Sequence, residues 1–140
     1  METKYYFDCQ CSYEPYLKAE NFANALAEKD QSITHIIFYI QSKKITSDLD
    51  KIFDFEKVKK MLKKKYMNSR NIPVIIESVK SFKKSTSNNH KQNLIFICFG
   101  LDSKELFKLE NYYNVKYIIA IPWIRKLLND WIDEFKPIPL

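Results

Sequence analysis

The chain has 140 residues, of which 46% are apolar, 29% charged and 15% aromatic, and this composition is typical of one compact domain rather than of a disordered chain. Its net charge is +6, it has two histidines, and its only glycine is Gly100. Glycine-rich nucleotide-binding loops are therefore excluded, and few residues remain for zinc sites or histidine-based catalysis.

The first predicted elements lie between residues 5 and 40. Residues 5–11 form a short run rich in aromatic side chains, which predicts a strand or an extended arm. Apolar residues at roughly helical spacing then predict a helix over residues 15–29. Residues 33–40 form a nearly continuous run of β-branched and aromatic side chains, which is typical of a strand covered on both faces.

The middle of the chain alternates in the same way. A polar connection with capping residues leads to a predicted helix over Phe55–Met67. Its apolar residues, beginning with Phe55, fall on one side of the helix, and most of its lysines fall on the other sides. Residues 73–76 and 93–99 read as buried strands. The polar, lysine-rich residues 81–92 between them predict an exposed loop.

Three elements complete the chain. Asp102 and Glu105 have the spacing of a capping box, which predicts a helix through about residue 113. Residues 115–121 predict a strand, and an amphipathic helix is expected from Trp123 onward. The alternation predicts an α/β fold with a parallel central sheet of about four strands flanked by helices, and an extra N-terminal strand and helix.

The order of elements from Thr34 onward, together with the last third of the sequence, resembles a BRCT domain. Val115–Ile124 is similar to that family's final strand and tryptophan, and Leu127 and Leu128 fall at its small-or-apolar pair. The tail 135–139 is similar to the family's proline-containing exit segment. Residues 68–72 and Ser42-Lys43 stand where the family usually has glycines.

The resemblance divides the chain into an N-terminal extension, residues 1–31, and a BRCT-like domain, residues 32–140. It implies a non-enzymatic protein-interaction module of a nuclear DNA repair, checkpoint or chromatin complex, with a partner that is phosphorylated or not. The family's phosphate pocket implies Ser42, Lys43 and Lys104 as phosphate-binding residues. A hydroxyl, a backbone N–H and an ammonium suit a phosphate dianion. The alternative is a strand-end serine and a solvated lysine.

A second hypothesis follows from the charge distribution. Residues 43–91 hold fourteen Lys and Arg against five Asp and Glu, whereas the remaining residues hold nine against twelve. Such a block favours contact with phosphates, whether on nucleic acid, on a phosphorylated protein or on an anionic membrane. The second hypothesis is sequence-independent contact with DNA or RNA phosphates, for which Tyr66 and Phe82 are candidates for stacking. The candidate residues are Lys57, Lys60, Lys63, Lys64, Arg70, Lys83 and Lys84. The alternative is a solvated face that only keeps the protein soluble.

Two tryptophans and three carboxylates have competing interpretations. Trp123 is expected to anchor the core, and Trp131 to share its face unless it is exposed to a partner. Asp8, Glu77 and Asp102 are carboxylates near the ends of predicted strands and would be the acids of a metal-dependent nuclease. Because Asp102 is more simply a helix cap, we expect no enzyme activity.

The cysteines and the hydropathy bear on the compartment. Cys9, Cys11 and Cys98 lack the spacing of a disulfide framework, so we expect free thiols in a reducing, intracellular compartment and neither a metal site nor a cofactor. No apolar run spans a membrane, and the N-terminus lacks a secretory signal. The role of residues 1–31 stays open, because an added helix can also pair with a second copy of the chain.

Overall fold

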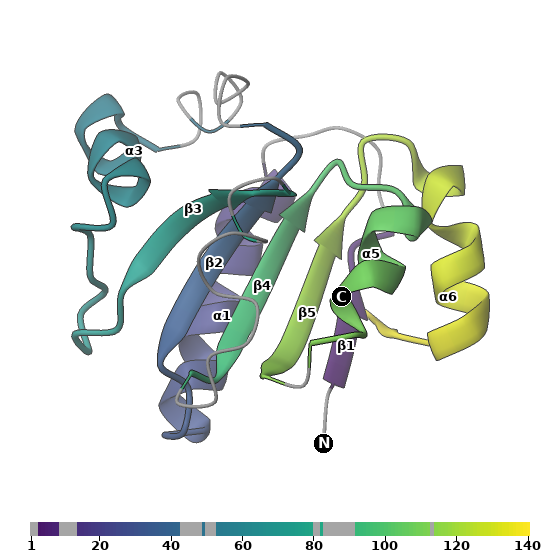
Figure 1. Cartoon of the computed structure of the whole chain (residues 1–140), viewed down its shortest axis with the longest axis horizontal. Coiled ribbons are helices and arrows are strands. Elements are labelled where there is room, and N and C mark those ends of the chain that lie inside the picture. Colours follow the sequence, from purple (N-terminus) through teal and green to yellow (C-terminus); the bar gives the residue numbers. More distant parts are fainter. Residues whose placement is uncertain are drawn as a thin grey trace.

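The computed structural model has a six-stranded, all-parallel sheet with helices on both faces (Figure 1). It describes residues 3–8, 14–42, 49, 53–79, 82, 92–112 and 114–140. The predicted α/β class is confirmed, and the sheet has more strands than the four or five that the sequence indicated.

The sheet has the strand order β3-β2-β4-β5-β1-β6. The strands are β1 (Thr3–Tyr6), β2 (His35–Ile40), β3 (Val74–Ser78), β4 (Leu94–Phe99), β5 (Val115–Ile121) and β6 (Ile138–Pro139). The central strands are buried on both faces because helices cover both, which explains their continuous apolar sequences.

The helices divide into two layers. They are α1 (Glu14–Lys29), α3 (Phe55–Leu62), α5 (Ser103–Leu109), the 3₁₀ turn η1 (Arg125–Leu128) and α6 (Asn129–Phe135). Buried residues of α1 and α3 share one hydrophobic core with one face of the sheet. Buried residues of α5, η1 and α6 share a second core on the other face.

The N-terminal segment is part of the same sheet. β1 lies between β5 and β6, and Thr3–Tyr6 pair in parallel with Tyr117–Ala120. The helix α1 then crosses one face of the sheet, where its small residues Ala19, Ala23 and Ala27 are buried. The segment predicted as an extension thus supplies an interior strand and a covering helix.

Two predicted helices have different bounds in the structure. The helix expected over Phe55–Met67 ends at Leu62, because Lys64 adopts a left-handed backbone (φ 61°) and closes the end with hydrogen bonds from Lys64 N to Met61 O and from Lys65 N to Lys60 O. The helix expected from Trp123 begins only at Asn129, after the 3₁₀ turn.

Of the two tryptophans, Trp131 is buried on the face that its helical spacing indicated, whereas Trp123 is not. Trp131 is fully buried, and its backbone N–H donates to Ser103 Oγ, which itself donates to the Leu127 carbonyl. Trp123 lies before the helix, at the end of β5, and is 37% exposed. The prediction that Trp123 anchors the core between the last helix and the sheet is therefore wrong.

No helix in the described part of the chain is long and apolar enough to span a membrane.

Candidate functional site: a cavity at the carboxyl edge of the sheet

The connections that leave β2 and β4 diverge to opposite faces of the sheet. The first helix after β2 for which the structure gives bounds is α3, whose Val58 and Met61 belong to one core. The helix that follows β4 is α5, whose Leu106 and Leu109 belong to the other. In parallel α/β sheets such divergence opens a crevice beyond the carboxyl ends of the two strands, and ligands bind there. A ligand site is therefore expected at this edge of the sheet.

A cavity of about 150 Å³ occupies this crevice. Its walls come from the ends of β2 and β4, from α1 and from the segment after β5. Ile40, Leu49 and Phe99 give it an apolar lining, and Gln41 and Ser42 are the polar side chains in it that directly follow β2. A cavity of this volume holds a group about the size of a benzene ring.

The chain's only glycine shapes the cavity. Gly100 follows β4 with a left-handed backbone (φ 64°), a conformation that other residues adopt only at a cost. A Cβ atom at this position would lie 2.5 Å from Cδ2 of Trp123, so the indole rests directly on the glycine backbone. Any side chain at position 100 would displace the indole that forms part of the wall.

Trp123 is also tied to α1. Its indole N–H donates to the Tyr16 hydroxyl oxygen at 3.0 Å, and the Tyr16 ring packs edge-on against Phe99, with 4.6 Å between ring centroids. Tyr16 is itself buried. The wall of the cavity therefore joins residues from the first helix, β4 and the end of β5.

The three residues implied for phosphate binding are only partly brought to this site. Ser42 lines the cavity. Lys43 lies outside the described residues. Lys104 is the second residue of α5, is exposed, and is not among the described residues that line the cavity.

The residues expected to contact nucleic acid fall into different groups. Three of them form ion pairs: Lys57 with Glu20 at 2.8 Å, Lys64 with Glu77 at 3.3 Å, and Arg70 with Glu28 at 2.6 Å. Lys60 and Lys63 are exposed, and Lys83 and Lys84 lie outside the described residues.

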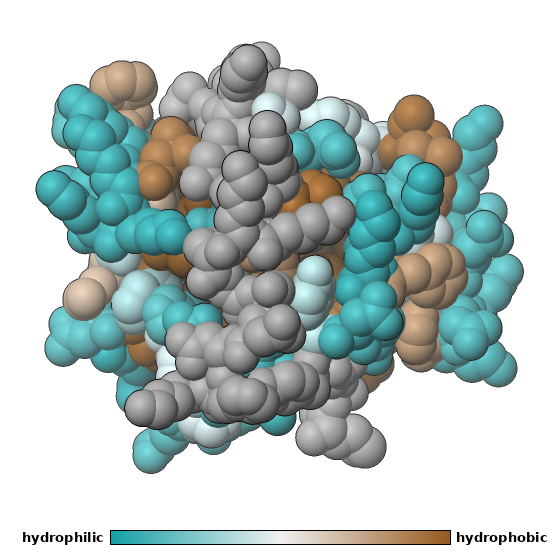
Figure 2. All heavy atoms as spheres, in the orientation of Figure 1, coloured by the Kyte–Doolittle hydropathy of each residue, from teal (hydrophilic) through white to brown (hydrophobic). Residues whose placement is uncertain are grey.

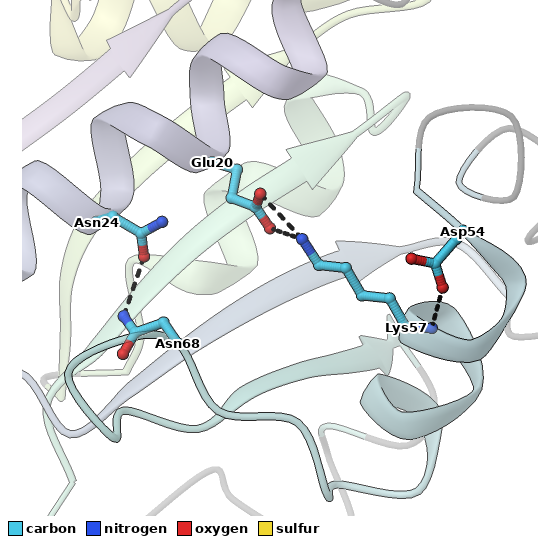
Figure 3. Close-up of polar contacts among 5 residues, drawn as sticks. All are labelled: Glu20, Asn24, Asp54, Lys57 and Asn68. Carbon is cyan, nitrogen blue, oxygen red and sulfur yellow. Dashed lines mark hydrogen bonds and ion pairs between the residues drawn. The ribbon is translucent and has the colours of Figure 1, made fainter.

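A polar seam between α1 and the α3 region accounts for two of these pairs. Glu20, Asn24 and Glu28 recur every fourth residue along α1, so they line one side of that helix. Figure 3 shows Lys57 reaching from α3 to Glu20, and Asn68 Nδ2 donating to Asn24 Oδ1 at 3.0 Å. The Lys57 ammonium also lies over the Phe53 and Tyr66 rings. Lys57 therefore makes contacts within the fold, including an ion pair that joins α3 to α1.

The expected stacking residues are in the wrong places for a nucleic acid. Phe82 is fully buried among Tyr39, Phe96 and Tyr112. The Tyr66 ring faces the Lys57 ammonium. Phe55, which was expected to begin the buried stripe of its helix, is instead 66% exposed. The first residue of a helix projects past the core that the later turns cover, so its place in the stripe was not enough to bury it.

A second cavity, of about 160 Å³, lies among the amino ends of β2, β3 and β4. His35, Lys64 and Gln92 are its polar lining. The Thr34 hydroxyl oxygen lies 2.9 Å from His35 Nδ1 and 3.2 Å from the Asn93 carbonyl oxygen, and it accepts a hydrogen bond from the Asn93 backbone N–H. Burial, and secondarily the Lys64 charge, lower the pKa of His35.

The carboxylates considered for a nuclease each have their own partner. Asp8 accepts from Arg125, Asp102 caps α5 by accepting from Glu105 N, and buried Glu77 pairs with Lys64. Among the described residues no cluster of His, Cys, Asp or Glu could hold a metal ion. Cys98 is a free thiol whose pKa is raised by burial, and Cys9 and Cys11 lie outside the described residues.

Of the described residues that line the cavity, the sequence indicated only Ser42 as a functional residue. Tyr16 was read only as part of a helix, and Trp123 as a core residue. The available signal was the single glycine directly after a buried strand, which marks a left-handed turn or a close approach.

Comparisons of the chain with protein-family models, with curated proteins and with solved structures found no match.

Proposed function

We propose that this chain is a non-enzymatic protein-interaction module that docks a segment of a partner protein at the carboxyl edge of its sheet. The observation that carries the proposal is the cavity of about 150 Å³ between the ends of β2 and β4. Pockets for drug-sized ligands and cofactors occupy about 300–1,000 Å³. The smaller cavity fits one apolar side chain, so the rest of the ligand lies outside it, as a peptide does.

The surface beside the cavity is apolar. Trp123, Ile124 and Leu127 are 37%, 51% and 46% exposed. Figure 2 shows hydrophobic surface over the segment that joins β5 to α6. Exposed aromatic and aliphatic side chains next to a pocket are the usual composition of a protein-binding hot spot. A partner segment can therefore anchor one side chain in the cavity and pack its neighbours on this surface.

The polar side chains give the proposal its finer form. The Ser42 hydroxyl lies in the cavity wall, at the position where the BRCT resemblance implies a phosphate contact. We therefore propose a partner that carries phosphoserine or phosphothreonine next to its anchoring side chain, with Lys43 and Lys104 as the further phosphate contacts. On the same resemblance the partner belongs to a nuclear DNA repair, checkpoint or chromatin complex.

Trp123 supplies the readout for a binding experiment. Trp131 is fully buried, whereas Trp123 is exposed at the cavity, so a docked side chain changes the fluorescence of Trp123 and leaves that of Trp131 unchanged. A degenerate phosphoserine/phosphothreonine peptide pool and its dephosphorylated counterpart are titrated into the protein. We expect saturable binding of the first pool with a change in tryptophan emission, which Trp123→Phe removes.

Two substitutions at one position separate the cavity from the phosphate. Ser42→Phe fills the cavity and should abolish binding of both pools, whereas Ser42→Ala, like Lys104→Ala, should remove only the preference for the phosphorylated pool. Ser69→Phe, on an exposed turn far from the cavity in sequence, is the matched control. If Ser42→Phe binds peptides as well as the unmodified protein does, the cavity is not the docking site.

A further inference from the structure

The outward side of α3 presents lysines around one aromatic ring. Phe55, Lys59 and Lys63 follow one another at intervals of four residues, so they lie in line on the helix, with Lys60 beside them. All four are exposed, and Phe55 is 66% exposed. Lys65 is exposed just beyond the helix end. Figure 2 shows a hydrophilic surface over this part of the molecule.

These lysines are not neutralised by neighbouring carboxylates. Lys59, Lys60, Lys63 and Lys65 have no ion-pair partner among the described residues. The nearby acids are used elsewhere, since Glu20 and Glu28 pair with Lys57 and Arg70 (Figure 3 shows the first pair) and Asp54 caps α3. Glu56 is the one exposed acid on α3 itself. The surface therefore has a local excess of positive charge.

The composition of this surface favours a nucleic acid over a membrane. A helix that lies in a bilayer interface must bury a whole apolar face, and Val58 and Met61 of α3 are already buried in the protein core. One exposed aromatic ring among lysines is instead the arrangement that proteins use to hold single strands, in which lysines bind phosphates and a ring stacks on a base. A duplex would offer the phosphates but no free base face.

We propose that the outward face of α3, formed by Phe55, Lys59, Lys60, Lys63 and Lys65, binds single-stranded nucleic acid without sequence preference. The lysines contact the backbone phosphates, and Phe55 stacks on one base. Since the helix of eight residues is about 12 Å long, the contact covers only a few nucleotides. The site is separate from the cavity at the carboxyl edge, and it needs neither Ser42 nor Lys104.

The dependence of binding on salt tests the phosphate contacts. Fluorescence anisotropy with a labelled oligothymidine is measured from about 20 to 200 mM salt. Each phosphate neutralised on a single strand contributes about −0.7 to the slope of log K against log salt, so four lysines predict a slope of about −3. Lys59→Gln/Lys63→Gln should reduce the steepness by about 1.4. Lys126→Gln/Lys136→Gln, which removes the same charge near α6, should leave it unchanged.

Two further variants keep the result independent of folding defects. Glu56→Gln removes the one acid of α3 that faces solvent and should raise affinity about threefold, a gain that a damaged fold would not produce. Phe55→Ala should lower affinity for the single strand about tenfold, with the salt slope unchanged, and leave any weak duplex binding as it was.

Three outcomes would overturn the proposal. The first is a salt slope that does not change in Lys59→Gln/Lys63→Gln. The second is binding to phosphatidylserine vesicles with none to the oligonucleotide, which would assign the surface to a membrane. The third is that polyglutamate displaces the labelled oligothymidine as well as unlabelled oligothymidine does, while Phe55→Ala leaves the affinity for the oligothymidine unchanged. This result would make the contact a general response to polyanions.

Discussion

At the scale of single residues, Gly100 has two reasons to be glycine, and they can be separated. Its left-handed backbone disfavours any side chain, and a Cβ atom would meet the Trp123 indole at 2.5 Å. Gly100→Ala should therefore lower the free energy of unfolding by about 2–4 kcal/mol, from about 1–2 kcal/mol of backbone strain plus overpacking. Urea unfolding measures this loss, and the emission of Trp123 should shift as the ring is displaced.

A double-mutant cycle isolates the contact with the indole. In a Trp123→Ala background the clash is absent, so Gly100→Ala should cost only the backbone strain, about 1–2 kcal/mol. Equal costs in the two backgrounds would show that the indole does not rest on this glycine.

His35 makes stability depend on pH. Burial lowers its pKa in the folded protein, so the unfolded chain takes up a proton as pH falls past the ordinary value of 6.5 while the folded protein does not. The free energy of unfolding should therefore decrease as pH falls from about 7.5 toward the lowered pKa. Urea unfolding at pH 7.5 and 5.5 should show a smaller decrease in His35→Gln than in the unmodified protein. An identical decrease in both would place the titrating group elsewhere.

At the scale of elements, two helix ends place a lysine where glycine is favoured. Lys136 ends α6 with φ 48° and is exposed, so Lys136→Gly should stabilise the protein by about 0.5–1 kcal/mol. Lys64 ends α3 with φ 61°, but its ammonium pairs with the fully buried Glu77. Lys64→Gly should therefore be destabilising, by about 1–2 kcal/mol, because a buried carboxylate loses its charged partner.

Thermal unfolding of these two variants gives the comparison directly. The same backbone change should raise the melting temperature at one helix end and lower it at the other. If both variants are stabilised, the contact between Lys64 and Glu77 contributes less than the left-handed strain costs.

The elements could be predicted from the sequence where their signals are local. β5 has the bounds expected from an apolar run that stops at Pro122, and Asp102 caps α5 as its spacing with Glu105 indicated. The end of α3 at Leu62 was missed because a left-handed lysine has no strong sequence signal. The start of α6 at Asn129 was missed because the 3₁₀ turn before it has none either.

The candidate site depends on contacts between distant residues, and this limits what the sequence could predict. Ser42 was identified from the end of a predicted strand, which is local information. Trp123 lines the cavity because β4 and β5 are neighbours and because Gly100 leaves room for the indole ring. Tyr16, which lies 107 residues before Trp123 in the sequence, reaches the cavity from α1. The spacing of Lys57 showed which side of α3 it occupies, but not that Glu20 stands opposite.

At the scale of the whole molecule, the sheet depends on its first strand. β6 pairs only with β1 in the described sheet, and β5 has β1 as its second neighbour. The buried alanines of α1 share a core with Ile97 and Phe99 of β4 and with Ile119 and Ile121 of β5. Removing residues 1–31 would expose these apolar side chains and leave β5 with an open edge.

We therefore expect residues 32–140 alone not to form a stable domain. Without the buried surface that β1 and α1 supply, this fragment should lack a cooperative urea transition and a near-ultraviolet circular dichroism signal, and it should bind a hydrophobic dye. A synthetic peptide of residues 1–31 should restore all three properties at a saturating concentration, since the cut lies in the connection between α1 and β2. A variant peptide with Ala19→Glu and Ala23→Glu, two fully buried positions on α1, should fail to do so. A cooperative transition in the fragment alone would instead make residues 32–140 the folding unit, with the first strand and helix attached to a sheet that is already stable.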